Sequence, residues 1–489
     1  MDKRLVKVTD LASIKVYLYT QKHRNVMFEE EDNIQINGLI NRYEEMVSEE
    51  TVGFFDVDQF ENITDYYFET GNISEALTTT EHAISQHPFS VIFHIKRAQL
   101  LTVHDRIEEA IEEVKKAELL APESSELKIT KANIYAKKGQ HEKAISTLLK
   151  ALPNTEDKLE VYELIAYEYQ AMGQFNKAIR YLKRVLTEDA SDDIAVYNIA
   201  FCYEMLGEHQ ESAKFFEGLV EDNPYSELAW HQLGYSLRNS KEYEKAIEAF
   251  DYAIVIDEHF TASYHEKAKT LMALKKYPEA AESYLETLEF EEPTGFTFLK
   301  IAECFKEAGN LKEAMLYCVK ATHEDPQLDE AWVESAMILD ALDKTLEGVH
   351  CMKKAIELDP ENPDYWYISA QFYWKVGLLG EAGLAYKQLL SLGVIESKIW
   401  LEFTELLIEQ DETELALDNL YNGLEAHPED AEMHYIAAGF FFANEFAKEG
   451  KLLLALALEL DPENKHIIFD NFPQLSEDKM ILDFIKSIG

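Results

Sequence analysis

The residues whose types and spacing come nearest to a metal-binding or catalytic pattern are one pair of histidines and one pair of glutamates. His231 and His265 stand at the same place in two successive segments of similar pattern, and Glu160 and Glu163 share one face of a predicted helix. A zinc site needs further ligands at matching spacing, and no motif supplies a third. Paired carboxylates can do acid–base catalysis, but with 92 acidic residues in 489 a solvated charged face is the simpler interpretation. We therefore expect no catalytic residue, no metal and no cofactor.

Cysteine usage and the N-terminal segment bear on the compartment. The cysteines form no CxxC pair and all fall within predicted helices: Cys202, Cys304, Cys318 and Cys351. This pattern is typical of reduced thiols in the cytosol and does not indicate a disulfide framework. The apolar stretch 11–19 contains Lys15 and lacks a small-residue cleavage site, so it does not predict a secretion signal. No stretch approaches the roughly 20 apolar residues of a membrane span, and we expect a cytoplasmic protein.

The acidic charge belongs to the body of the chain. The formal net charge is −46, to which residues 1–56 contribute −4 (7 basic against 11 acidic) and residues 465–489 contribute −1 (3 against 4). The remaining −41 is spread over residues 57–464. Such a field repels nucleic acid and anionic lipid and favours partners with a basic segment, although general solubility explains it equally well.

The elements that would position any site are pairs of helices. Residues 227–260 predict two amphipathic helices folded back on each other across a short polar turn. Small residues fall where the two helices must approach closely, at Gly234 and Ala246. Large residues fall where the space between helices must be filled, at Trp230 and Phe250.

This pattern repeats without a slip. Twelve units of equal length start at residue 57 and end at residue 464, with no insertion or deletion. The eighth residue of every unit is Ala, Gly or Thr, and the twentieth is Ala, Gly or Ser. The eleventh is aromatic or Leu throughout, and the fourth is bulky and apolar in nine units, with His94, Lys128 and His434 as the exceptions. An array in which each unit packs on its neighbours is indicated.

The pattern resembles the tetratricopeptide repeat, whose 34-residue helix–turn–helix unit has Trp, Leu-Gly, Tyr, Ala, Phe and Pro at fixed offsets. Proline closes seven units here, and the resemblance covers 408 of the 489 residues. It implies an all-α fold, a right-handed α-solenoid. Leu237 and Glu258 depart from the motif in the sixth unit, where Tyr and Pro are usual.

The chain is predicted to have three parts: 1–56, 57–464 and 465–489. In the first, a loosely ordered or strand-like leader over 1–32 precedes an amphipathic helix over 34–48 that would cover the first repeat. In the last, Pro473 interrupts the repeat pattern, and Ser476 is placed to cap a final helix over 476–487. Both terminal helices are interpreted as capping elements.

In tetratricopeptide arrays, residues 2, 5, 9, 12 and 13 of each unit line a concave groove. Carried over to this chain, that assignment gives acidic side chains in the first unit and in units eight to twelve, with an aromatic and slightly basic centre between them. The candidate binding residues of that centre are Tyr167, Tyr197, Phe201, His231, Tyr235, Arg238, His265 and Lys269. Exposed aromatics with Arg suit peptide recognition. The alternative, that Tyr197, Phe201 and Tyr235 pack between neighbouring first helices, stays open at this point.

The sequence favours a non-enzymatic scaffold or adaptor that binds a protein or peptide in the groove. A rival interpretation is a regulatory receptor in which a peptide or small ligand changes the pitch of the superhelix. A clamp for the C-terminal carboxylate of chaperones, known in one subfamily, is not indicated, since Leu164 stands where the unit after Asn133 would need Asn, and Asn198 lacks flanking lysines. The sequence indicates neither the oligomeric state nor the identity of the partner.

Overall fold

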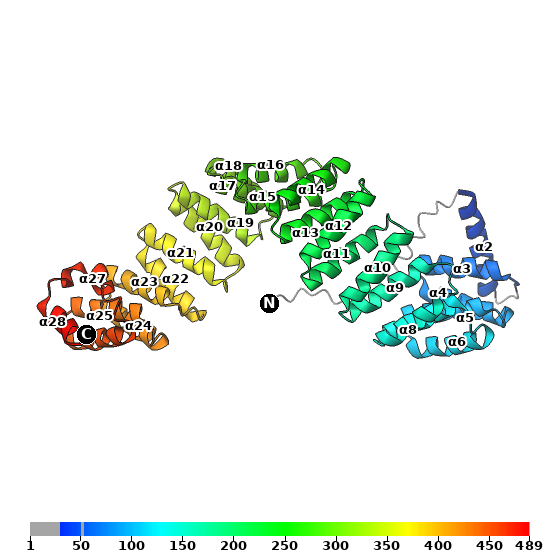
Figure 1. The fold of residues 1–489 in the computed structure, drawn as a ribbon, viewed down its shortest axis with the longest axis horizontal. Helices are drawn as coiled ribbons and strands as arrows, with labels where there is room; N and C mark the ends of the chain where they lie inside the picture. The colour runs from blue at the N-terminus through cyan, green and yellow to red at the C-terminus, as the bar shows by residue number, and fades with distance from the viewer. Residues whose placement is uncertain (1–29, 50–52, 489) are drawn as a thin grey trace. The chain divides into compact units, whose positions relative to one another are not determined.

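In a computed structural model of the chain, residues 30–49 and 53–488 are described. They form 27 α-helices and one short 3-10 helix, and no β-strand occurs among them (Figure 1). The chain divides into two compact units, residues 1–260 and residues 261–489, and each is considered by itself. The leader expected over 1–32 lies almost wholly outside the described residues.

The first unit contains α2 followed by six helix pairs. Their bounds are α2 Glu30–Ser48, α3 Val57–Glu69, α4 Ile73–Gln86, α5 Val91–Val103, α6 Ile107–Leu120, α7 Ser125–Lys137, α8 His141–Ala151, α9 Lys158–Ala171, α10 Phe175–Glu188, α11 Asp193–Leu206, α12 His209–Asp222, α13 Glu227–Asn239 and α14 Tyr243–Ile256.

The second unit contains six more pairs and a C-terminal segment. Their bounds are α15 Thr261–Ala273, α16 Tyr277–Thr287, α17 Gly295–Glu307, α18 Leu311–Glu324, α19 Asp329–Ala341, α20 Thr345–Leu358, α21 Pro363–Lys375, α22 Leu379–Ser391, α23 Ser397–Glu409, α24 Thr413–Ala426, α25 Ala431–Ala443, α26 Ala447–Leu460, α27 Ile467–Asn471, the 3-10 helix η2 Pro473–Leu475 and α28 Lys479–Ile488.

The predicted all-α solenoid of helix pairs is confirmed. Between residues 57 and 464 there are twelve pairs, and their second helices begin at a constant interval of one unit, from Ile73 to Ala447. The first helices keep the same interval, except that α9 begins one residue early. Consecutive pairs are visible along the ribbon in Figure 1.

Each pair is joined by a turn with one residue in the left-handed backbone conformation. That residue is always the fifteenth of its unit, and it is Gly in six units and Asp, Lys or Glu in the others. Lys241 (φ 65°) and Glu445 (φ 70°) adopt it although they carry a Cβ. Such a residue ends a helix by turning the chain away from its axis, so it fixes where each second helix can start.

Close approach within a pair depends on the small residues. A Cβ placed on Gly234 of α13 would lie 2.7 Å from the ring of Phe250 of α14. Phe250 and Ala246 are fully buried. The ring of one helix therefore fills the space that the missing side chain of the other leaves, as close-packed protein interiors require.

Two units have a buried histidine at the fourth position, where most units have a large apolar residue. Both histidines have a hydrogen-bond partner. His94 is buried, and its Nδ1 lies 2.7 Å from Oε2 of Glu113 on the facing helix α6. His434 is buried as well, and its Nδ1 lies 2.7 Å from the backbone oxygen of Asp430. Hydrogen bonds offset the cost of burying these rings.

At the N-terminal end, α2 packs on the first pair. Ile40 and Tyr43 are buried, and the Tyr43 hydroxyl lies 2.8 Å from Nδ1 of His82. The helix predicted over 34–48 begins earlier, at Glu30. Its interpretation as a cap, and the division of the chain into three parts, stay predictions.

At the C-terminal end, the predicted start of the last helix is wrong. The Ser476 hydroxyl donates to the backbone oxygen of Pro473 at 2.6 Å, so Ser476 closes the end of η2. α28 begins at Lys479, and the side chain of Asp478 accepts the backbone N–H of Met480 at 2.8 Å. Asp caps helices as well as Ser does, and here the Ser476 hydroxyl bonds within the preceding turn while Asp478 takes the capping position.

The packing of the C-terminal segment on α25 can be tested at Gly439. A Cβ at this position would overlap the ring of Phe472. We expect Gly439→Ala to lower the free energy of unfolding by about 1–3 kcal/mol and to increase hydrogen exchange in residues 467–488. Gly218→Ala in α12 is the matched control, because nothing lies within 4 Å of its Cβ; it should stabilise the helix by roughly 0.5–1 kcal/mol. Equal stabilities of the two variants would contradict the assigned contact.

We expect the free energy of unfolding to depend on pH because of the contact between His94 and Glu113. Burial alone would raise the pKa of Glu113, but hydrogen bonds from Lys116 (2.9 Å) and His94 hold this pKa below its usual value. When the pKa of a carboxyl is lower in the folded state than in the unfolded chain, where it is about 4.3 for Glu, the ionised carboxylate stabilises the fold at any pH above the unfolded value. This stabilisation is lost as the pH falls through the folded-state pKa.

We expect Glu113→Gln to lower the free energy of unfolding at pH 7 by about 1–3 kcal/mol, with a smaller difference from the parent protein at pH 3. Urea denaturation at both pH values measures this. Glu142→Gln, at an exposed position of α8, should show neither effect. A pH-independent loss in Glu113→Gln would exclude the ionised pair as its cause.

Candidate functional site

In the first unit, the first helices of successive pairs lie side by side. Gln170 of α9 donates to Oδ1 of Asn198 of α11 at 3.2 Å, and Asn239 of α13 donates to Oε2 of Glu204 of α11 at 3.3 Å. The side chains of α9, α11 and α13 can therefore contribute to one surface.

The centre of this surface is a row of exposed apolar side chains on α11. Tyr197, Phe201 and Met205 are 51%, 50% and 54% exposed, and Ile194 precedes them at helical spacing. We call these four residues the α11 stripe. The opposite side of the helix is buried, as Ile199 shows. An apolar row of this length is more than the isolated exposed apolar residues of an ordinary surface.

The two helices beside α11 each carry an aromatic side chain at a predicted groove position, Tyr167 on α9 and Tyr235 on α13. Tyr167 of α9 is half-buried, and its hydroxyl accepts a long hydrogen bond (3.5 Å) from Nδ2 of Asn198. On α13, the guanidinium carbon of Arg238 lies 4.9 Å from the centroid of the Tyr235 ring. This cation–π contact holds a positive charge beside an aromatic surface.

Carboxylates gather at the N-terminal end of the stripe. Burial raises the pKa of Asp193, and the charges of Glu227, Asp192 and Asp189 raise it further. The pKa of Tyr197 is raised by burial and then by Asp193 and Glu227. These shifts mean that negative charges repel one another at this end, and a cation placed there would be attracted.

His231 does not belong to this surface. It is buried, with its ring centroid 5.6 Å from that of Phe250 and 5.2 Å from that of Phe260. The sequence position predicted a groove residue, because periodicity gives the face of a helix but not the depth to which neighbouring rings cover it.

In the second unit, His265 and Lys269 have partners of their own. Nε2 of His265 lies 2.8 Å from Oε1 of Glu291, and its ring lies against that of Tyr284 (5.6 Å between centroids). Lys269 is exposed, and its Nζ lies 2.7 Å from Oε1 of Glu266. This exposed pair leaves Lys269 accessible but reduces its net positive field.

The acidic surface predicted for the first repeat is partly neutralised. Lys96 of α5 lies 2.5 Å from Oδ1 of Asp65 and 3.7 Å from Oε1 of Glu61. Lys96 stands at the sixth position of its unit, which is not among the positions predicted to line the groove. The available signal was that Lys96 follows Asp65 by nearly one unit length, a spacing that brings side chains of neighbouring first helices together.

The described residues do not form a metal centre or an activated thiol. They contain no cluster of three or more His, Cys, Asp or Glu side chains that could hold a metal ion. All four cysteines are buried. Burial raises the pKa of Cys304 and of Cys318 to about 12, so neither is a thiolate at neutral pH. In the part of the chain that the structure describes, no helix is both long and apolar enough to cross a membrane.

Comparison with known families agrees with the repeat architecture. Three family models, each described as Tetratricopeptide repeat, match residues 169–233, residues 227–260, and residues 125–152 together with 329–362. These matches show that the chain contains tetratricopeptide repeats, and the unbroken register and the twelve helix pairs are consistent with the same repeat over residues 57–464.

Among solved structures, the chain is similar to YrrB, a TPR protein described as having an unusual peptide-binding site, with 19% identity, a TM-score of 0.32, and coverage of 37% of this chain and 93% of YrrB. It is also similar to MamA, with 16% identity, a TM-score of 0.32, and coverage of 33% and 94%. The C-terminal part of a TPR repeat-containing protein from Cytophaga hutchinsonii gives 18% identity, a TM-score of 0.43, and coverage of 49% and 98%. No curated protein gives a significant match.

Stability measurements distinguish an exposed stripe from packing residues. Because Tyr197 and Phe201 are about half exposed, we expect Tyr197→Ser and Phe201→Ser each to lower the free energy of unfolding by less than about 1 kcal/mol. Ile199→Ala, on the buried side of the same helix, should cost about 2–5 kcal/mol. Thermal and guanidinium denaturation provide the comparison. If Phe201→Ser costs as much as Ile199→Ala, the stripe serves packing between helices.

Proposed function

We propose that this protein is a non-enzymatic scaffold and that a protein segment docks on the α11 stripe and its flanking aromatics. Tetratricopeptide-repeat proteins generally act as scaffolds for protein interactions. The observation that carries the proposal is the exposure of Tyr197, Phe201 and Met205 in one row. Large apolar and aromatic side chains supply most of the binding energy at protein interfaces.

The chemistry of the surface defines the partner. The apolar row runs from Ile194 to Met205, a length of about 16 Å at roughly 1.5 Å per helical residue. Asp193 and Glu227 place negative charge at its N-terminal end. We propose an amphipathic peptide segment with two or three apolar side chains on one face and a Lys or Arg beside them. The charge attracts and orients the segment, and burial of the apolar side chains holds it.

The remaining features of the proposed function follow from charge and cysteine usage. The net charge of −46 opposes binding to nucleic acid and to anionic membranes. Four reduced, buried thiols suit the cytoplasm. We therefore propose a cytoplasmic protein whose ligands at this surface are proteins.

The proposal can be tested without knowing the natural partner. A library of short peptides displayed on phage is selected against the full chain, and selected peptides are measured by fluorescence anisotropy. We expect a shared pattern of apolar residues three or four apart next to Lys or Arg. Tyr197→Ala/Phe201→Ala/Met205→Ala should weaken binding by about tenfold or more, since each anchor contributes on the order of 1 kcal/mol.

The control variant removes three apolar side chains elsewhere in the first unit that are more exposed than the stripe, at 85%, 87% and 82%: Phe89→Ala/Leu119→Ala/Val255→Ala. It should bind the selected peptides as the parent does. Glu227→Gln should weaken the basic peptides selectively and reduce the salt dependence of their affinity. Unchanged binding by the folded α11 variant would overturn the assignment of the site.

A further inference from the structure

The pair α7–α8 lacks a ring at two positions, the fourth and the twenty-third of the unit, where other pairs carry Phe, Tyr, Trp or His. In α9–α10, the ring of Tyr181 stacks on that of Tyr169, 5.7 Å away, and also contacts Tyr162. These are the twenty-third, eleventh and fourth residues of the unit. In residues 125–158, Tyr135 keeps the eleventh position, but Lys128 and Thr147 take the fourth and twenty-third. In each of the other eleven units, at least one of these two positions carries a ring.

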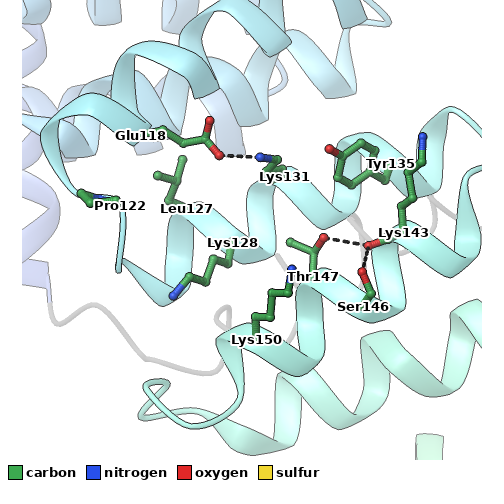
Figure 2. A pocket seen from close by; sticks show the side chains of 10 residues that line it. All are labelled: Glu118, Pro122, Leu127, Lys128, Lys131, Tyr135, Lys143, Ser146, Thr147 and Lys150. Atoms are coloured by element: carbon green, nitrogen blue, oxygen red, sulfur yellow. Dashed lines mark hydrogen bonds and ion pairs between the residues drawn. The ribbon is translucent and has the colours of Figure 1, made fainter.

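A cavity of about 310 Å³ occupies the place of the missing rings. Four lysines line it: Lys128 and Lys131 from α7, and Lys143 and Lys150 from α8. In Figure 2, Lys128, Lys131 and Lys150 lie around Thr147, whereas the ammonium group of Lys143 lies beside Tyr135 and away from Thr147. Its volume is at the lower end of the range of small-molecule sites, about 300–1,000 Å³.

The positive charge of this pair stands out against the rest of the array. Residues 125–158 contain seven lysines and four acidic residues, a net +3, whereas acidic residues outnumber basic ones in each of the other eleven units. A run of surface lysines would normally be a solvated face. Here the lysines come from two helices and share one hollow, which a random excess of lysine does not explain.

Acidic neighbours neutralise only part of this charge. Nζ of Lys131 lies 2.5 Å from Oε1 of Glu118, which also lines the cavity, and Nζ of Lys128 lies 2.9 Å from Oε2 of Glu123. Glu123 is 84% exposed, so its pair with Lys128 is weak. Lys143 and Lys150 have no carboxylate partner among the described residues; Lys143 donates to Oε1 of Gln140 at 2.9 Å. Lys143 also lies over the ring of Tyr135, with its Nζ 5.9 Å from the ring centroid. An entering anion would therefore be the first charged partner of Lys150 among the described residues, and for Lys128 it would compete only with the exposed Glu123.

The rest of the lining limits the size and character of the ligand. Pro122, Leu127 and Tyr135 give the cavity an apolar side. The hydroxyls of Ser146 and Thr147 donate to the backbone oxygen of Lys143 at 3.3 Å and 2.7 Å, so the donors for a ligand are chiefly the lysine ammonium groups. Lysine binds phosphate as a point charge, and a dianion gains more from this site than a monocarboxylate does.

We propose that the cavity between α7 and α8 binds a phosphate monoester, with Lys128, Lys131 and Lys150 holding the phosphate group and the Tyr135 side covering the attached carbon group. The site is separate from the α11 stripe, and it needs no catalytic step. The phosphate monoester can come from a free metabolite or from a phosphorylated side chain of another protein, and the two sources share this chemistry.

Isothermal titration calorimetry on the full chain tests the site with inorganic phosphate and with O-phosphoserine. We expect saturable binding of one equivalent of each, with O-phosphoserine bound more tightly because it reaches the apolar side, and no saturable binding of acetate. Lys128→Gln/Lys150→Gln should weaken binding by about tenfold or more through loss of two charge-assisted contacts. Absence of saturable phosphate binding by the parent protein would overturn the proposal.

Two further variants separate a built site from general positive charge. Thr147→Tyr leaves every lysine in place but fills the cavity with the ring that Tyr181 supplies in the next pair, so it should abolish binding. Lys115→Gln/Lys214→Gln removes two exposed lysines outside the cavity and should leave binding unchanged. Retained binding in Thr147→Tyr, or equal loss in the control, would show that phosphate responds only to surface charge.

The same titration distinguishes the two sources. A phosphoserine peptide that binds at least as tightly as O-phosphoserine supports a phosphorylated protein as the ligand. Exclusion of the peptide, with free O-phosphoserine still bound, supports a small metabolite. Binding of the unphosphorylated peptide with equal affinity would overturn the role of the phosphate group.

Discussion

The close contact between the two helices of each pair is the constraint on which the rest of this structure depends. Gly234 leaves the space that the Phe250 ring fills, and a Cβ there would lie 2.7 Å from that ring. Ala246 and Ala268 are likewise fully buried at the small positions of their units. Within each compact unit, neighbouring pairs pack on one another, so an error in this spacing would be passed to the next pair. The strict register of the sequence follows from this requirement.

The two proposed binding surfaces differ from the repeat pattern in opposite ways: one adds exposed apolar side chains, and the other lacks rings. At the α11 stripe, Tyr197 and Phe201 add apolar area that stays about half exposed, although the Phe201 ring also meets the ring of Phe175 on α10, 6.0 Å between centroids. At the α7–α8 cavity, Lys128 and Thr147 remove rings that other pairs use for filling. Because the small residues and the turn residues still set the packing of each helix pair, the fold tolerates both differences. Residues that differ from the repeat motif therefore indicate which ligands a surface could bind, whereas the motif residues indicate only the fold.

The repeat register allowed the fold to be predicted almost completely from the sequence. Periodicity located every helix pair, because small and bulky residues recur at fixed intervals. Periodicity was less informative about which side chains are exposed and which partners they have. It assigned His231 to the groove, but the rings of Phe250 and Phe260 cover it. It also missed Lys96, whose pairing with Asp65 links two neighbouring units and depends on the length and direction of a side chain.

Local backbone conformation was the other property that the sequence concealed. The fifteenth residue of each unit is left-handed, and six glycines were the available signal, but Lys241 and Glu445 adopt the same conformation with side chains that disfavour it. Tertiary packing on both sides of the turn overrides this local preference. The helix start at Lys479 was missed for a different reason: the Ser476 hydroxyl bonds back to Pro473 within the preceding turn, and the side chain of Asp478 accepts the N–H of Met480 in the first turn of α28.

The constant unit length has a consequence for how such a chain can change over generations. An insertion of one or a few residues inside the array would shift every following small residue away from its interface. Duplication or deletion of one whole unit restores the register at once, because both ends of the unit meet the same kind of neighbour. Such a gene can therefore lengthen or shorten in whole units, and a segment with its own chemistry, such as residues 125–158, can be copied to a new place as a block.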